Sequence, residues 1–191
     1  MKYSVACLLA LLSLSTLSAQ TLEGESVIGI NAGFSMASAL FSLSEIDANV
    51  DATTPPAIQA TYDYALTNRV SLGGGISYQN FKLAYSNYGE AKESFDVRLS
   101  RFNVGLRGLF HYGNSEKMDM YSGLRVGLSK WSLDVGTDDP SFDPPKTAGI
   151  VFAPQAILFG MRSYLSGHLG IGGEIAIGAP HVVSFGLHYR F

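Results

Sequence analysis

The sequence predicts an all-β protein, specifically an eight-stranded antiparallel up-and-down transmembrane β-barrel, and three observations support this. The last ten residues alternate apolar with polar or small side chains, the period-2 pattern of a strand with one apolar face. Seven further segments are rich in Tyr, Phe, Val, Ile and Gly, a composition typical of strands that include bends. The connections between segments are alternately short and long, as in barrels that cross a membrane.

The eight predicted strands account for most of the chain after residue 25. Their approximate ranges are 26–37, 57–66, 70–84, 97–112, 118–133, 149–165, 168–178 and 182–191. Most of them reach the roughly 9–11 residues that a tilted membrane strand needs. An even number of strands brings both ends of the barrel chain to the same rim.

The connections predict two different rims. The second, fourth and sixth are short and span residues 67–69, 113–117 and 166–167. The first, third and fifth are long and polar and span residues 38–56, 85–96 and 134–148, whereas the seventh, residues 179–181, is short. Acidic side chains are concentrated in the long connections, so the sequence predicts three acidic loops on one rim.

The N-terminal residues predict export. Lys2 precedes an apolar stretch of about ten residues and then a run of small residues, which indicates a signal peptide at 1–19, cleaved before Gln20. A spanning helix needs about 20 apolar residues, so this stretch is too short to be one. The barrel domain is then 20–191. Cys7 is the one cysteine and lies within the signal segment, which argues against a lipid anchor and against disulfides.

The alternation also assigns each strand an apolar and a polar face. In the segment 97–112, Phe102 and Val104 share the apolar face, whereas Asn103 lies on the opposite one. A soluble, lipocalin-like barrel would bury its apolar face and expose its charges. The polar face here is too rich in Gly, Ser, Asn, Gln and Thr for such an outer surface, so the membrane barrel is favoured and a lipocalin-like carrier is the alternative.

The same facing rule directs several charged side chains into the lumen. These are Glu174, Arg107, Arg125, Asp63 and Arg101. The interior of a small barrel is filled by side chains, and a buried charge without a partner is very costly. We therefore expect a structural cluster of ion pairs that fixes the strand register. A proton or ion path, opened by exchange of partners, is the alternative.

The C-terminal hairpins resemble those of a known family. The segments GMRSYL (160–165) and GIGGE (170–174) and the terminal LHYRF (187–191) are similar to the small eight-stranded outer-membrane β-barrels, the OmpA/OmpX-like and porin-family "outer membrane protein β-barrel domain" group. This resemblance implies the outer membrane of a Gram-negative cell. It also implies that Phe191 and Tyr189 form an assembly signal for the barrel-assembly machinery. The peptidoglycan-binding domain of longer OmpA-type proteins is not expected.

Composition and spacing restrict the partners. The formal net charge is −3 and no basic stripe is present, so nucleic acid is not expected. The acidic residues of the fifth connection lack the ordered spacing of a calcium loop, so no metal and no cofactor are expected. The expected partners are outer-membrane lipid and lipopolysaccharide, and the expected state is a monomer. Aromatic residues near strand ends, Tyr121 and Trp131 among them, are expected in interfacial girdles.

The histidines give no catalytic signature. Lipid-modifying barrels need a serine activated by a histidine that a carboxylate orients. His181 and Ser184 are three residues apart and face opposite sides of a strand, and His188 lies about 13 Å from Ser184 at the ordinary strand rise. We therefore expect no enzymatic activity, but a structural or surface-interaction role in the cell envelope. A narrow porin or small-solute channel is the alternative, and a lipid-modifying enzyme is the third class.

Overall fold

The computed structural model describes residues 22–42, 50–88, 93–112, 115, 117–137, 147–165 and 167–191. The predicted signal peptide at 1–19 lies outside the described residues. The elements are β1 (Ser26–Phe34), α2 (Met36–Ser42), β2 (Val50–Thr53), β3 (Ala57–Thr67), β4 (Val70–Tyr88), β5 (Glu93–His111), β6 (Met118–Thr137), β7 (Thr147–Phe152), β8 (Gln155–Tyr164), β9 (Leu169–Gly178) and β10 (Val183–Arg190). Within the described part of the chain, no helix has the length and apolar character needed to cross a membrane.

Eight of the strands close into a barrel. The ring runs β1-β3-β4-β5-β6-β8-β9-β10, and the pairing of β1 with β10 closes it. Every neighbouring pair in this ring is antiparallel. The predicted fold class is therefore confirmed. The two remaining strands, β2 and β7, add to the edges of β4 and β6.

The barrel wall is apolar outside and polar inside. Along β3, exposed and buried residues alternate strictly over most of the strand. Ile58 and Tyr62 are exposed on the outer side, whereas Gln59 and Asp63 are buried in the lumen. A surface of exposed Ile, Leu, Val and Phe around the whole ring is unfavourable in water and is the surface that a bilayer requires. The apolar outer face of the alternating strands therefore indicates that lipid surrounds the ring.

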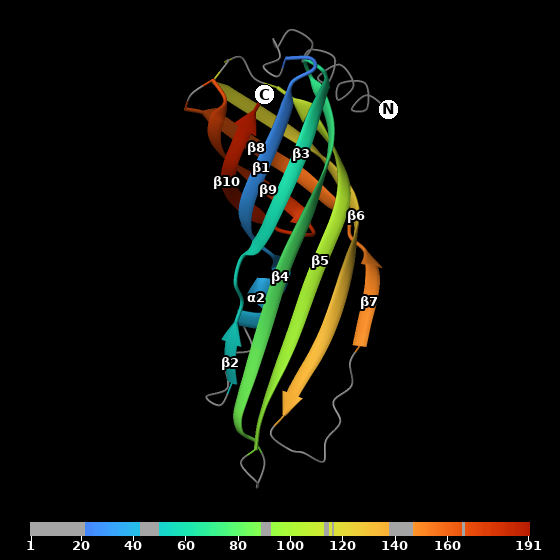
Figure 1. Ribbon diagram of the computed structural model, residues 1–191, viewed down its shortest axis with the longest axis vertical. Helices are drawn as coiled ribbons and strands as arrows, with labels where there is room; N and C mark the ends of the chain where they lie inside the picture. The colour runs from blue at the N-terminus through green and yellow to red at the C-terminus, as the bar shows by residue number, and fades with distance from the viewer. Residues whose placement is uncertain are drawn as a thin grey trace, which may run out of the picture.

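Three strands continue beyond the rest of the barrel. Strands β4, β5 and β6 have 19, 19 and 20 residues, compared with 8–11 in the other strands of the ring. Figure 1 shows them running past the end of the barrel, with β2 and β7 along their two sides. We call the five-stranded part formed by residues 81–88, 93–100 and 130–137 with β2 and β7 the extension. It lies at the end opposite the C-terminus.

The two faces of the strands exchange polarity where the extension begins. Outward positions in the barrel are apolar, but the outward positions of the extension include Lys82, Arg98 and Asp134, which are cross-strand neighbours. The inward positions of the extension are instead apolar, namely Phe81, Leu83, Tyr85, Phe95, Val97, Leu99, Trp131, Leu133 and Val135. A polar outer face is suited to water, so the bilayer ends near the outward row of Tyr78, Phe102 and Lys130.

This exchange of polarity explains two differences from the sequence predictions. The third and fifth connections, predicted over residues 85–96 and 134–148, are shorter because β4, β5 and β6 continue into them. In these residues the outward side chains are polar and the inward ones apolar, which is the reverse of the arrangement in the membrane part. A search for strands with apolar outward positions therefore assigns them to polar loops. The first connection, predicted as a loop over 38–56, contains α2 and β2. The strand predicted to reach residue 37 ends at Phe34.

The strand predicted over 149–165 is divided into β7 and β8. The interruption lies at Ala153 and Pro154, and both strands pair with β6. Pro154 has no backbone N–H to donate to a ladder, which ends regular pairing there. As a consequence β7 belongs to the extension and β8 to the barrel ring.

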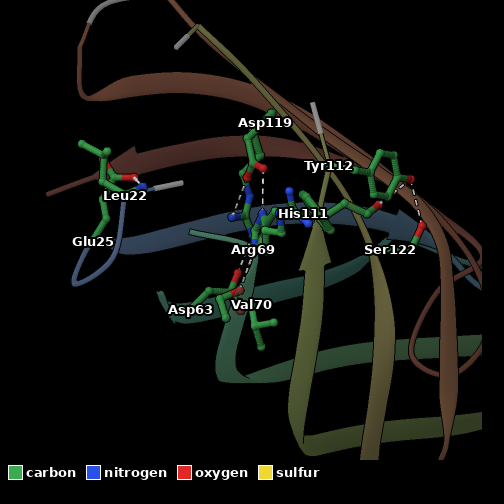
Figure 2. A network of polar contacts seen from close by, with 12 residues as sticks. Leu22, Glu25, Asp63, Arg69, Val70, His111, Tyr112, Asp119 and Ser122 are labelled. Carbon is green, nitrogen blue, oxygen red and sulfur yellow. Dashed lines mark hydrogen bonds and ion pairs between the residues drawn. The ribbon is translucent and has the colours of Figure 1, made fainter. Parts of the chain in front are cut away.

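A β-bulge in β8 reverses the facing of its second half. Leu158 and Phe159 are consecutive and both exposed, so Ile157 before them and Gly160 after them both face the lumen. Ser122 Oγ donates to the carbonyl of Leu158 at 2.6 Å. The side chains of Tyr112 and Ser122 are hydrogen-bonded at 2.9 Å, as Figure 2 shows. After the bulge, the lumen-facing positions of β8 are the even-numbered ones.

Candidate functional site in the lumen

Five buried ionised side chains form a continuous network across the lumen. Arg107 Nε lies 3.1 Å from Asp63 Oδ1, and its Nη2 lies 2.5 Å from Glu174 Oε1. Arg162 pairs with the second oxygen of Asp63 and reaches Asp119 Oδ2 at 3.4 Å. We call Asp63, Arg107, Asp119, Arg162 and Glu174 the lumen network. None of the five is more than 5 % exposed. Because they come from five different strands, their pairing fixes the relative register of most of the ring.

Tyr121 and His181 complete the coordination of Glu174. The Tyr121 hydroxyl donates to Glu174 Oε1 at 2.8 Å, and His181 Nε2 lies 3.3 Å from Glu174 Oε2. The Tyr121 ring also lies 4.5 Å from the guanidinium carbon of Arg162, which is cation–π geometry. Tyr121 is fully buried in the lumen, so its predicted place in an interfacial girdle is wrong. A ring that packs against the guanidinium groups of Arg107 and Arg162 is favourable inside the barrel, and these arginines would lose that contact if the ring faced the lipid.

Asp119 links the network to a histidine and a serine at the end of the barrel opposite the extension. In Figure 2, Asp119 lies above and Asp63 below, with the label of His111 between them in height. His111 Nδ1 lies 2.7 Å from Asp119 Oδ1, and its Nε2 lies 2.7 Å from Ser71 Oγ. This order of contacts is the order found in hydrolytic triads. Ser71 is only 2 % exposed, however, and Asp119 is shared with Arg162. In this structure the hydroxyl is therefore not accessible to a substrate carbonyl.

The burial of Ser71 leads to a chemical prediction. A fluorophosphonate probe, which modifies activated serines, is expected to leave the folded protein unlabelled because the probe does not reach Ser71 Oγ. Ser71→Ala is expected to remain folded and to lose about 1 kcal/mol of stability, the usual value of one hydrogen bond. The measurement is labelling in detergent micelles followed by intact-mass analysis. Labelling of the native chain that Ser71→Ala abolishes would instead establish a reactive serine.

Arg101 and Arg125 face the lumen but lie outside the network. Arg101 Nη2 donates to Gln79 Oε1 at 2.8 Å and to the carbonyl of Pro180, and its guanidinium lies 5.3 Å from the ring of Trp131. Arg125 Nη2 donates to the carbonyl of Gly75 at 2.9 Å. The structure thus brings Asp63, Arg107 and Glu174 together, whereas neither Arg101 nor Arg125 makes an ion pair with a described carboxylate.

Helix α2 lies against the inner face of β4 where the extension begins. Ser35 Oγ donates to Gln79 Oε1 at 3.0 Å, and Gln79 Nε2 donates to Ser38 Oγ at 2.8 Å. The rings of Phe41 and Phe81 are stacked with centroids 4.8 Å apart. These contacts join the helix to the inner face of β4. At this end of the lumen α2 therefore packs against β4, whereas the lumen network fills the middle.

Several members of the site were absent from the sequence prediction. They are Arg162, Asp119, Tyr121, His111 and His181. For two of them a signal was present, because Asp119 and Tyr121 share the parity of Arg125 in a strand without a change of facing. Arg162 was concealed by the bulge in β8, since uninterrupted alternation from Gln155 places it outside.

Gly160 makes room for Tyr121, and this gives a stability prediction. A Cβ at Gly160 would lie 2.2 Å from the Tyr121 ring, so Gly160→Ala forces the ring away from Glu174. We expect a loss of about 2–3 kcal/mol, as for an overpacked core. The matched control is Gly108→Ala, because nothing lies within 4 Å of a Cβ there. Heat-induced unfolding in non-ionic detergent measures both, and equal midpoints for the two variants would contradict the packing argument.

The C-terminal residues of the proposed assembly signal lie at the seam that closes the barrel. Tyr189 and Phe191 are both exposed on the outer wall. The backbone of Phe191 exchanges two hydrogen bonds with Ser26, at 2.8 and 2.9 Å. Their role as a signal stays a prediction. Among the described residues, no group of three or more His, Asp or Glu side chains is placed to hold a metal ion.

A closed apolar-walled ring with a polar, ion-paired interior defines the class of integral β-barrel membrane proteins. Residues 7–191 match the family model described as the outer membrane protein beta-barrel domain, so the chain belongs to this family. Family membership implies location in the outer membrane. No curated protein matches the chain.

Solved structures of small outer-membrane proteins have a similar fold. OprG from Pseudomonas aeruginosa has a TM-score of 0.56 at 12% identity, and the match covers 91% of this chain and 99% of that one. The attachment invasion locus protein Ail of Yersinia pestis, in complex with the heparin analogue sucrose octasulfate, has a TM-score of 0.50 at 15% identity, covering 89% and 100%. The N-terminal barrel domain of Pseudomonas aeruginosa OprF has a TM-score of 0.50 at 11% identity, covering 90% and 100%.

Proposed function

We propose that this outer-membrane barrel is a non-enzymatic surface-interaction protein that displays the extension outside the cell. The observation that carries the proposal is the exchange of polarity along β4, β5 and β6. A membrane strand gains nothing from continuing some eight residues into water unless the added sheet is used there. The extension also has free strand edges at β2 and β7 within the described part of the chain, and such edges accept further strands.

The state of the lumen supports an interaction role over the porin alternative. A conducting pore exposes its lining to water, but Arg107, Arg125 and Arg162 are each no more than 2 % exposed. Water therefore does not pass along these side chains in this structure. The network instead supports a barrel that is a rigid base for the extension.

The charge of the extension favours partners that are not polyanions. Its described outward positions and their neighbours include Lys82, Arg98 and Lys130, together with Asp51, Asp96 and Asp134. Three cations balance three anions, so a sulfated glycan such as the ligand in the Ail complex has no net attraction to this wall. An extended protein segment that pairs with β7 is favoured, because the outer edge of β7 has no partner strand within the described part of the chain. Outer-membrane lipid, lipopolysaccharide and the barrel-assembly machinery stay expected partners of the barrel itself.

The test of the proposed function is adhesion. Cells that display the protein are expected to adhere to epithelial monolayers, or to one another, more than cells without it. Ala148→Lys places a charge on the free strand β7 and is expected to reduce this gain. The matched control is Gly108→Ala on the membrane-facing wall, which leaves the extension unchanged. Adhesion equal to that of cells lacking the protein, with conducting steps in planar bilayers, would replace this proposal by the porin.

The orientation of the extension has its own prediction. The one cysteine lies in the predicted signal segment, so single cysteines can be introduced for labelling. Asp134→Cys, in the extension, is expected to react on intact cells with a membrane-impermeant maleimide. Ser115→Cys, in the short turn before β6, is expected to react only after the outer membrane is opened, because short turns are periplasmic. The reverse pattern would invert the topology.

A further inference from the structure

Arg125 is a buried cation whose hydrogen-bonding capacity is largely unused. It is 1 % exposed, and its Nη2 donates to the carbonyl of Gly75 at 2.9 Å. Its Nε and Nη1 have no hydrogen-bond partner in the described part of the chain. Buried guanidinium N–H groups are normally satisfied, because an unsatisfied charged donor is costly. Arg125 therefore calls for a ligand that accepts hydrogen bonds.

A second unpartnered donor lies beside it. Gln59 on β3 is 2 % exposed, and neither its Nε2 nor its Oε1 has a partner among the described residues. A Cβ built on Gly75 would lie 3.7 Å from Gln59 Nε2, and one built on Gly105 would lie 2.9 Å from Arg125 Nε. Gly75 and Gly105 are direct cross-strand partners. Three unpartnered N–H-bearing nitrogens thus surround one pair of lumen-facing glycines.

The charge of Arg125 is also uncompensated. The described lumen holds four arginines and three carboxylates, and each carboxylate is in contact with Arg107 or Arg162. The direct cross-strand partner of Arg125 is Arg107, which is itself a cation. Glu174 is already engaged by Arg107, so Arg125 experiences a net positive surrounding. Placing an isolated cation there is unfavourable unless an anion accompanies it.

We propose that Arg125 and Gln59 bind a small inorganic anion, such as chloride, in the lumen beside Gly75. The anion accepts hydrogen bonds from Arg125 Nε and from the Gln59 amide, and it neutralises the positive charge of Arg125, which pairs with no carboxylate of the lumen network. A water molecule could accept the same hydrogen bonds from Arg125 and Gln59, but it would not neutralise the positive charge of Arg125. Both side chains are almost fully buried, so the ligand must be a small ion. It is a fixed structural ligand of the closed lumen, and its binding does not depend on the role of the extension.

The experiment compares unfolding in chloride and in gluconate, a large organic anion, at constant sodium concentration. Thermal unfolding of the purified protein in non-ionic detergent is followed by the fluorescence of Trp131, the one tryptophan. Because a ligand of the folded state stabilises it by mass action, the midpoint is expected to rise saturably by roughly 5 °C as chloride replaces gluconate. Bromide, a similarly small anion, is expected to act alike.

Three variants make the result specific. Arg125→Gln is expected to lose the chloride dependence, whereas Lys130→Gln, which removes an exposed cation on the outer wall, is expected to retain it. If Arg125→Gln does not fold, Gln59→Leu keeps the cation and removes one donor. It is expected to raise the chloride concentration for half of the shift several-fold. Coincident midpoints in chloride and gluconate, or a full shift in Arg125→Gln, would overturn the proposal and assign water to these donors.

Discussion

Asp63→Asn is expected to lower the stability of the barrel by about 3–5 kcal/mol, the loss typical when one partner of a buried ion pair is removed. Asp63 is the one carboxylate of the lumen network that contacts both Arg107 and Arg162. Asparagine preserves the shape and one carbonyl oxygen but removes the charge. Arg107 and Arg162 then lose the carboxylate that they share, in a lumen that already has more arginines than carboxylates.

The measurement is the temperature at which the protein unfolds in dodecyl sulfate, seen as the change in mobility between unheated and boiled samples. A drop of about 10 °C corresponds to the expected loss for a chain of this size. The matched control is Asp96→Asn, which breaks the partly exposed pair of Asp96 and Arg98 at 2.8 Å. That variant is expected to lose no more than about 1 kcal/mol. Equal shifts for the two variants would show that the lumen network does not hold the ring together.

The facing of the lumen residues was predictable from sequence because strand alternation is strictly local. Asp63, Arg107 and Glu174 follow from the apolar residues next to them, and no tertiary information is needed. Their depth in the lumen is a different matter. Depth depends on the stagger of one strand against the next, which the hydrogen-bond ladder sets over the whole ring. For this reason Arg101 and Arg125 were placed on the correct face but in the wrong cluster.

Two further features could not be read from one sequence. The bulge at Leu158 and Phe159 changes the parity of β8, and its stabilising partner Ser122 lies on another strand, 36 residues away in sequence. The exchange of polarity in the extension looks like the end of a strand if a membrane is assumed throughout. Both errors arise because a period-2 pattern reports facing only while strand geometry and solvent stay constant.

Glu174→Gln separates a plug from a pore more directly than any other single change. Glu174 is bound by Arg107 at 2.5 Å, by the Tyr121 hydroxyl at 2.8 Å and by His181 at 3.3 Å. Glutamine keeps the volume but removes the charge that these three groups share. We expect a loss of about 3 kcal/mol, since the cation of Arg107 then has Asp63 alone. We expect no conducting steps in planar bilayers from either the native protein or the variant, because the lumen side chains keep their volume.

The control for this change is Glu25→Gln, which breaks a second Glu–Arg pair, Glu25 to Arg190 at 3.1 Å, at the rim of the same barrel. It is expected to cost about 1 kcal/mol or less, because both partners are partly exposed. If Glu174→Gln changes conductance and leaves the unfolding temperature unchanged, the cluster is a gate and the porin alternative holds. If Glu174→Gln changes neither the conductance nor the unfolding temperature, the Glu174 carboxylate does not stabilise the interior of the barrel. Asp63 and Asp119 must then balance the charge of the arginines without it.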